Sequence, residues 1–148
     1  MKDVYVTISI GGEITLDGNG FSVIGPWQDT RAIVLLGENI TIRNIKVRDF
    51  GYCMFSGYKS HYLIVTDSTF EHCEMGLFGN NMRIEGNQIS GGEGRGIELQ
   101  GSDNSILRNV ITDNSQGGIL MYESDNNLIS ENDILNTTEG SFCGSCVD

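Results

Sequence analysis

The sequence predicts an all-β fold, a right-handed parallel β-helix of about six coils. Three observations support this prediction: a repeat of 19–23 residues, strands too short to stand alone, and turns rich in Gly, Asn, Asp and Ser. Helices need an apolar period of 3.6 over about ten or more residues, and no window of the sequence shows it. At 148 residues, the chain is long enough for one domain with a sizeable core.

Two motifs carry the repeat with the same step. In the first, an apolar residue is followed three positions later by a small or amide residue and two further on by another apolar one. It reads Ile42-Ile45-Val47, Val65-Ser68-Phe70, Ile84-Asn87-Ile89, Ile106-Asn109-Ile111 and Ile129-Asn132-Ile134. In the second, a small residue precedes an apolar one: Ala32-Ile33, Cys53-Met54, Gly76-Leu77, Gly96-Ile97 and Gly118-Ile119. We expect each strand to pair with its equivalent in the next coil, which makes every sheet parallel.

The coils are predicted to span residues 1–138, followed by a C-terminal tail or cap at 139–148. At the turn position of the first motif, Asn87, Asn109 and Asn132 form a candidate ladder in which each amide bonds to the next coil. Such a ladder satisfies polar groups whose burial would otherwise cost several kcal/mol. Because so little follows the last coil, the chain is expected to be a minimal self-associating protein or part of a longer one.

The charge balance narrows the choice of partners. With 9 basic and 20 acidic residues, the net charge is −11. Nucleic acids need clustered Lys and Arg, so they are not expected as partners, and neither are anionic membranes. Acidic polysaccharides are disfavoured unless a cation or a local basic patch intervenes. No apolar signal segment follows Met1, and the run Ala32–Leu36 is too short to span a membrane, so the localisation stays open.

Several segments resemble the pectate-lyase-like superfamily, and most of all its NosD-type repeats, found in carbohydrate-binding proteins and sugar hydrolases. They are Ile14 to Gly25 (ITLDGNGFSVIG), Asn39 to Ile45 (NITIRNI), Asn104 to Ile111 (NSILRNVI) and Gly118-Ile-Leu. The resemblance covers about residues 10–138 and implies the β-helix fold. It implies no activity, because these repeats encode the scaffold and not a site.

Enzymes of that superfamily carry their catalytic residues on outward positions of stacked strands. The motifs of its polygalacturonases and alginate epimerases are absent from this sequence. One cluster could serve a polysaccharide lyase or hydrolase, because it combines a base with cations: Lys46, Arg48, Glu71 and His72. Arg48 and Glu71 share a column one coil apart, so a surface ion pair is the competing interpretation, and Arg108 and Glu131 repeat the relation.

An outward column of sheet positions is unexpectedly apolar. It reads Val34, Phe55, Phe78, Glu98 and Leu120, with Tyr58, Tyr62 and Tyr122 close by in the sequence. An exposed apolar stripe of this length usually marks an interaction surface. Three interpretations stay open: the face of a homo-oligomer, a surface covered by the chain's own tail, or aromatic rings that stack on sugars.

The four cysteines leave two further alternatives. Cys143 and Cys146 have the spacing of metal ligands or of a tail disulfide, and Cys53, Cys73 and His72 could complete a zinc site. Cys53 and Cys73 occupy small or apolar repeat positions, however, where cysteine packs as a small hydrophobe. We therefore expect no bound metal, although the many Asp and Asn residues leave calcium possible.

Three functions are compatible with these features of the sequence. The first is a non-catalytic β-helix module, self-associating, that binds a glycan or a protein partner through an outward face. The second is a small polysaccharide lyase or glycoside hydrolase. The third is a structural or adhesin-like segment of a phage or surface protein. The missing catalytic motifs favour the first and the third, and the sequence does not decide whether the protein is an enzyme.

Overall fold

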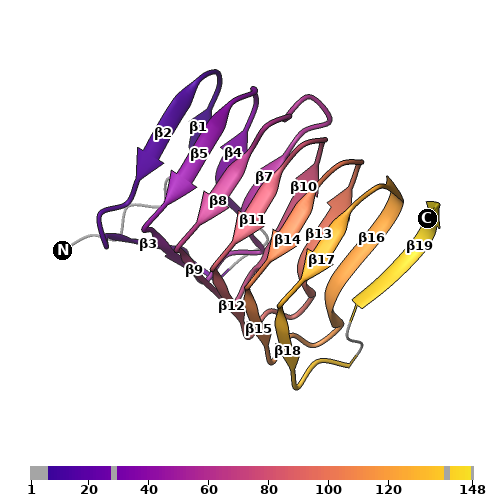
Figure 1. Cartoon of the computed structure of the whole chain (residues 1–148). Coiled ribbons are helices and arrows are strands. Elements are labelled where there is room, and N and C mark those ends of the chain that lie inside the picture. The colour runs from indigo at the N-terminus through magenta and orange to yellow at the C-terminus, as the bar shows by residue number, and fades with distance from the viewer. Residues whose placement is uncertain (1–6, 28–29, 139–140, 148) are drawn as a thin grey trace.

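The computed structural model describes residues 7–27, 30–138 and 141–147, with side chains described up to residue 138. The described residues form 19 strands in three parallel sheets, stacked as a β-solenoid of about six turns (Figure 1). The predicted parallel β-helix is therefore confirmed. Within the described ranges there is no helix long and apolar enough to cross a membrane.

We name the three sheets A, B and C in the order in which each coil visits them. Sheet A contains β1 (Ile8–Ile10), β4 (Arg31–Leu35), β7 (Tyr52–Ser56), β10 (Glu74–Phe78), β13 (Arg95–Gln100), β16 (Gly117–Asp125) and β19 (Ser141–Val147). Sheet B contains β2 (Ile14–Asp17), β5 (Ile40–Arg43), β8 (Ile64–Thr66), β11 (Arg83–Glu85), β14 (Ser105–Leu107) and β17 (Leu128–Ser130). Sheet C contains β3 (Ser22–Ile24), β6 (Lys46–Arg48), β9 (Thr69–Glu71), β12 (Gln88–Ser90), β15 (Val110–Thr112) and β18 (Asp133–Leu135).

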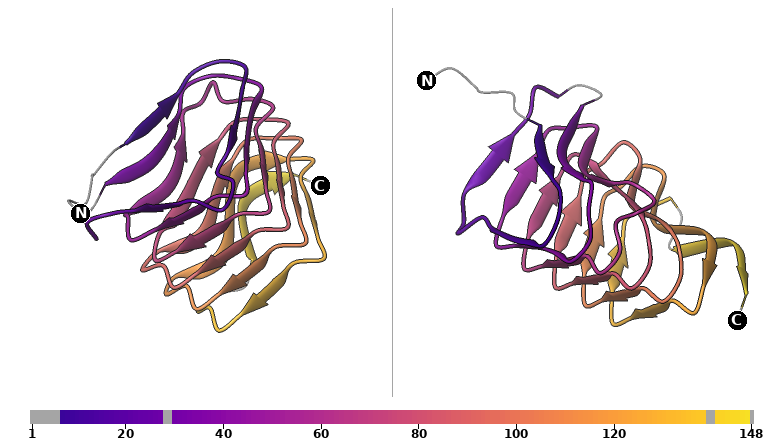
Figure 2. Two further views of the ribbon diagram at one scale, coloured as in Figure 1. Left: turned by 90° about the vertical axis from the view of Figure 1, so that its left-hand side faces the viewer. Right: turned by 90° about the horizontal axis from the view of Figure 1, so that it is seen from above.

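The coils stack one above the next, so that β1 and β19 lie at opposite ends of sheet A (Figure 2). The first sequence motif is in register throughout: Val65 pairs with Ile42 and Ile84, and Ile106 pairs with Ile84 and Ile129. These side chains form a continuous column of the buried core, with the β12 and β15 isoleucines in a second one. The repeat thus determines both the fold and the register of sheets B and C.

Each coil turns at three corners, and one residue at each corner has a left-handed backbone. In one coil these are Tyr62, Asp67 and His72, with φ of 56°, 51° and 56°. The same spacing of five residues recurs in four other coils: Asn39, Asn44 and Asp49; Asn81, Gly86 and Gly91; Asp103, Arg108 and Asp113; Asn126, Glu131 and Asn136. Gly, Asn and Asp reach this conformation at low cost, which explains their abundance at the turns.

The residue that follows each of these corner residues is buried or half-buried, and at the corner between sheets B and C it builds the predicted ladder. Asn87 Nδ2 donates to Asn109 Oδ1 at 3.0 Å, and Asn109 Nδ2 donates to Asn132 Oδ1 at 2.9 Å. Ser68 continues the column, because its backbone N–H donates to Asn87 Oδ1 at 3.1 Å. The asparagine ladder is confirmed.

A second ladder, which we did not predict, lies at the corner between sheets A and B. Asn104 Oδ1 accepts from the backbone N–H of Met82, and Asn127 Oδ1 accepts from that of Asn104, both at 2.8 Å. Asn104 Nδ2 also donates to Gly79 O at 3.2 Å. Both ladders pin neighbouring coils together through buried amides, which satisfies backbone groups that the sheets leave free at the corners.

Past residue 138, the chain returns to sheet A. The backbone of β19 pairs in parallel with β16, placing Ser141 opposite Ile119 and Val147 opposite Asp125. Residues 139 and 140, where the predicted tail begins, lie outside the described residues. The boundary at residue 138 therefore stays a prediction.

Candidate ligand-binding surface

The outer face of sheet A carries a connected group of five aromatic rings, which we call the aromatic cluster. Phe55 lies 5.5 Å, centroid to centroid, from both Tyr52 and Phe78. Phe78 in turn lies 5.3 Å from Tyr58 and 6.5 Å from Tyr122. Tilted and edge-on rings at these separations attract one another beyond the gain from burial alone. The cluster is therefore a packed unit that bridges several coils, and Tyr58, 72% exposed, is its most accessible ring.

Polar groups border the aromatic cluster. The guanidinium carbon of Arg31 lies 3.7 Å from the centroid of the Phe55 ring, within the range of a cation–π contact. The Tyr122 hydroxyl lies near the Glu98 carboxylate. Burial, and then the negative charge of Glu98, raise the pKa of Tyr122 to about 12. The surface thus offers rings and hydrogen-bonding groups side by side.

The predicted outward column is wrong at Phe78. The register places Gly76, and not Phe78, between Phe55 and Glu98. Phe78 instead pairs with Gln100, two positions further along the strand. The observed column is Val34, Phe55, Gly76, Glu98 and Leu120.

The error has a local cause, a register shift in β10. Tyr52 pairs with Glu74, yet Met54 pairs with Met75, so Cys53 has no partner in β10. Met75, and not the predicted Leu77, therefore stacks on Met54. The shift also places a glycine beneath the rings: a Cβ atom on Gly76 would lie 3.2 Å from a Tyr52 ring carbon and 3.3 Å from one of Phe55. Because Gly76 has no side chain, the Tyr52 and Phe55 rings can pack over β10.

Tyr62, which the sequence placed with this stripe, lies apart from the aromatic cluster. It is 52% exposed and occupies a left-handed position at the corner between sheets A and B. Among the described residues, no ring contact joins it to the cluster. Val34 and Leu120 do lie on the outer face and are half-buried.

A pair of carboxyl groups adjoins the aromatic cluster. Glu74, on β10, is hydrogen-bonded to Glu98, on β13. Burial, followed by the hydrogen bond and the charge of Glu98, raises the pKa of Glu74 to about 7, while nearby Arg95 opposes the rise. Two carboxyl groups can bond directly only by sharing a proton. Glycosidases place their two carboxyl groups about 5 to 9.5 Å apart so that sugar or water fits between them, and a carboxyl pair that shares a proton leaves no such gap.

Beside this pair, a depression of about 460 Å³ follows the corner between sheets C and A. Its described lining contains the rings of Trp27, Phe50, Tyr52 and His72, the carboxyl groups of Glu74 and Glu93, and Gln116. The Trp27 and His72 rings meet edge-on with centroids 4.9 Å apart. Tyr52 and Glu74 belong both to the depression and to the outer face of sheet A, so the two form one continuous surface.

The four weak catalytic candidates divide into two groups, one around the Lys46–Glu71 ion pair and one around Asp49, which contacts both Arg48 and His72. Lys46 Nζ lies 2.7 Å from Glu71 Oε1, and Arg48 Nη1 lies 3.0 Å from Asp49 Oδ2. The expected pairing of Arg48 with Glu71 is therefore wrong, although the two residues do share a column. Lys46 pairs with the Glu71 carboxylate, and Arg48 pairs instead with the adjacent Asp49. Of the four candidates, only His72 lines the depression, and its Nδ1 lies 2.9 Å from Asp49 Oδ1.

The second predicted ion pair is confirmed. Arg108 Nη1 lies 3.3 Å from Glu131 Oε2, and the same guanidinium also binds Glu85, which in turn pairs with Arg83. These exposed groups stack along the corner between sheets B and C. Exposed pairs of this kind contribute about 0–1 kcal/mol each, so we assign them no role in a site.

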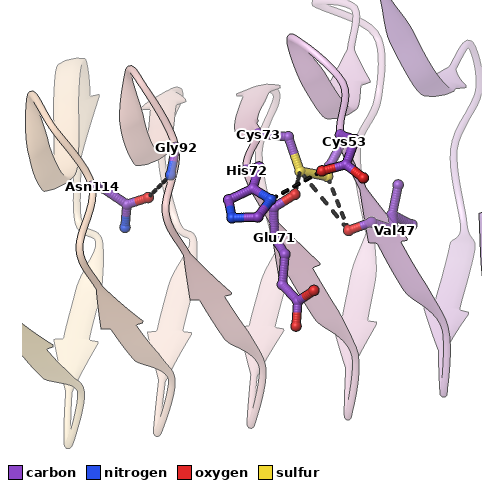
Figure 3. The surroundings of a disulfide bond; sticks show 8 residues. Val47, Cys53, Glu71, His72, Cys73, Gly92 and Asn114 are labelled. Atoms are coloured by element: carbon purple, nitrogen blue, oxygen red, sulfur yellow. Dashed lines mark hydrogen bonds and ion pairs between the residues drawn. A yellow bond between two sulfur atoms is a disulfide. The ribbon is translucent and has the colours of Figure 1, made fainter. Parts of the chain in front are cut away.

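Cys53 and Cys73 form a disulfide that joins β7 to the corner beside His72 (Figure 3). The sequence left the redox state of these two cysteines open, and they fill small or apolar repeat positions in the core as a bonded pair. Their Cα atoms lie 5.3 Å apart because Cys53 faces the core at the register shift and Cys73 follows a left-handed corner residue. The bond also removes both sulfurs from the alternative zinc site. The side chains of Cys143 and Cys146 lie outside the described residues.

The shared proton of Glu74 predicts a pH dependence of stability. The folded protein holds this proton more tightly than the unfolded chain, whose glutamate titrates near 4.5. The stabilisation is therefore complete below pH 4.5 and is lost as the pH rises through about 7. We expect Glu74→Gln, which stays neutral, to raise the free energy of unfolding at pH 8 by about 1 kcal/mol, a value reduced because water screens this partly exposed group.

Urea unfolding at pH 4.5 and pH 8 measures this effect, with Glu93→Gln as the matched control because Glu93 is exposed on the same edge. Equal gains for both variants at pH 8 would show that general charge repulsion, and not the shared proton, causes the change.

These features define a parallel β-helix protein with an aromatic outer face bordered by carboxyl groups. The chain belongs to the NosD family: the family model described as periplasmic copper-binding protein (NosD) matches residues 7–147. The NosD-type resemblance is thereby confirmed. No curated protein and no solved structure matches the chain significantly.

Because the family description names copper, the described side chains can be compared with what copper requires, which is a set of His, Cys or Met ligands. No three or more His, Cys, Asp or Glu side chains gather as a metal site within the described part of the chain. Cys53 and Cys73 are bonded to each other, His72 Nδ1 faces Asp49, and His61 Nδ1 accepts from the Asn80 backbone at 3.1 Å. The described side chains do not fit a copper site.

Proposed function

We propose that this NosD-family protein is a non-catalytic β-helix module that binds a glycan on the outer face of sheet A. The observation that carries the proposal is the aromatic cluster with its polar border. Sugar rings present apolar C–H faces and equatorial hydroxyl groups, so they suit a surface of aromatic rings interspersed with hydrogen-bonding groups. Tyr58 and Phe78 offer the rings, while Glu98 and Gln100 lie on the next strand, β13, with polar side chains.

Charge and compartment support the proposal. The net charge of −11 favours a glycan without acidic groups, because like charges repel along the whole surface. The family description places its namesake in the periplasm, and the Cys53–Cys73 disulfide is of the kind that persists in such an oxidising compartment.

The test is a binding assay by calorimetry or affinity electrophoresis with neutral oligosaccharides, namely hexamers of glucose, xylose and N-acetylglucosamine. For the sugar that binds best, we expect Phe78→Ala to weaken binding about tenfold, because losing one packed aromatic anchor typically costs 1–2 kcal/mol. Tyr62→Asn is the matched control: it removes an exposed ring outside the aromatic cluster and keeps a residue suited to the left-handed backbone. Equal losses in both variants would contradict the proposal, and so would failure of all three neutral hexamers together with the glucosamine hexamer.

Self-association through the same face stays a prediction, and sedimentation addresses it. If the wild type sediments as an oligomer and both Phe55→Asp and Phe78→Asp sediment as monomers, a second copy occupies the aromatic cluster and the glycan proposal fails. A wild-type monomer leaves the face free for the sugar.

A further inference from the structure

The depression at the corner between sheets C and A has a chemical character of its own. Its described lining combines four rings with two carboxyl groups, and no Lys or Arg belongs to that lining. Glu93 is exposed at its edge, and Glu74 lies deeper, bonded to Glu98. Since Glu74 holds the proton that it shares with Glu98, Glu93 supplies the negative charge of this lining. A cavity that pairs aromatic rings with a carboxylate attracts organic cations, because ring faces and carboxylates both carry negative potential.

The rings are fixed in position. Trp27 is 55% exposed, yet its ring meets His72 edge-on, and the Nδ1 atom of His72 faces Asp49 at 2.9 Å. Trp27 and His72 both have a left-handed backbone, with φ of 56° for each, the conformation that the corner residues of this solenoid share. Opposite His72 there is no side chain: a Cβ on Gly91 would lie 2.7 Å from His72 Cδ2. The depression therefore has the Trp27 and His72 rings on one side and, at Gly91, no side chain on the other.

We propose that this depression binds the ammonium group of an amino sugar within the glycan. The inference rests on the proposed function and names its substrate class: a polymer of hexosamine that lacks N-acetyl groups. The sugar's rings lie along the aromatic cluster, which meets the depression at Tyr52, and its ammonium group lies between the Trp27 ring and the Glu93 carboxylate.

The test compares two hexamers that differ only in charge, glucosamine and N-acetylglucosamine, at pH 6, where the free amine is protonated. We expect the glucosamine hexamer to bind about tenfold more tightly, the combined size of an exposed cation–π contact and a surface ion pair. Trp27 is the chain's one tryptophan and lines the depression, so its fluorescence reports occupancy of this site directly. We expect the emission to change with glucosamine hexamer and to change little with the N-acetylated one.

Glu93→Gln should reduce the preference for glucosamine several-fold, and Glu93→Lys should abolish it. Glu38→Gln is the charge-matched control, because Glu38 is exposed at the other edge of sheet A, outside the depression. Equal affinities for the two hexamers would overturn the ammonium site while leaving the glycan proposal standing. Methylammonium that binds as tightly as the hexamer would overturn the amino-sugar assignment. Failure of both hexamers and of the neutral sugars would remove the proposed function itself.

Discussion

Replacing Asn109 by alanine is expected to lower the free energy of unfolding by about 4 kcal/mol, a large fraction of the stability of a single domain. The Asn109 side chain makes four hydrogen bonds inside the solenoid. Its Oδ1 accepts from the backbone N–H and from Nδ2 of Asn87, both at 3.0 Å. Its Nδ2 donates to Ile84 O and to Asn132 Oδ1, both at 2.9 Å. Alanine leaves polar groups on both neighbouring coils without these partners.

A serine at the same position should be intermediate, because Ser68 already shows what serine does in this column. Its hydroxyl accepts from the Ile45 backbone at 3.4 Å and donates to Thr66 O at 2.8 Å, which is half of the asparagine set. We therefore expect Asn109→Ser to lose about 2 kcal/mol. Urea unfolding followed by circular dichroism measures both losses, with the exposed neighbour Gln88→Ala as a control within about 0.5 kcal/mol. A loss in Asn109→Ala no larger than in the control would show that the ladder contributes nothing.

The ladder could be predicted from the sequence because its members have the same residue type and nearly the same step. Asn87, Asn109 and Asn132 stand at one motif position, 22 and 23 residues apart, and the isoleucines that precede them pair in register. The same logic was available for Asn104 and Asn127, which also stand 23 residues apart. They were missed because no apolar motif frames them, so the column had to be seen from the structure.

The register of sheet A was harder to predict, because small residues recur there in more than one frame. Gly76-Leu77 fits the small–apolar motif, yet Met75, two residues before Leu77, pairs with Met54. Phe78 consequently left the predicted column. A sequence pattern that tolerates steps of 19–23 residues cannot locate a shift of one residue, whereas backbone pairing does so unambiguously.

The candidate surface was predicted in part. The aromatic residues at Phe55, Phe78, Tyr58 and Tyr122 were recognised, since exposed rings are conspicuous in an outward column. The depression was not, because its lining comes from successive coils and meets only through folding. Glu74 was one of many acidic residues, and the feature that distinguishes it, a hydrogen bond to a second carboxyl group, does not exist in a sequence.

Reduction of the Cys53–Cys73 disulfide is expected to lower the free energy of unfolding by about 3 kcal/mol. The bond closes a loop of 20 residues, and the loss of chain entropy in the unfolded state accounts for a gain of that size. Both thiols would keep acceptors in the reduced protein: Cys53 Sγ lies 3.4 Å from Val47 O, and Cys73 Sγ lies 3.1 Å from Glu71 O (Figure 3). Reduction therefore removes the cross-link without leaving a buried polar group unpaired.

The measurement compares urea unfolding of the oxidised protein, the reduced protein and the double variant Cys53→Ala/Cys73→Ala. The reduced protein isolates the cross-link, and the double variant adds the loss of sulfur packing, so it should be somewhat less stable still. The double variant is also the control for the reductant, which should leave its stability unchanged. Alkylation of the unreduced protein in denaturant, where both residues are accessible, followed by mass spectrometry, reports the bond directly. Two freely alkylated thiols at Cys53 and Cys73 would show that these residues only pack against each other, as the apolar repeat positions first indicated.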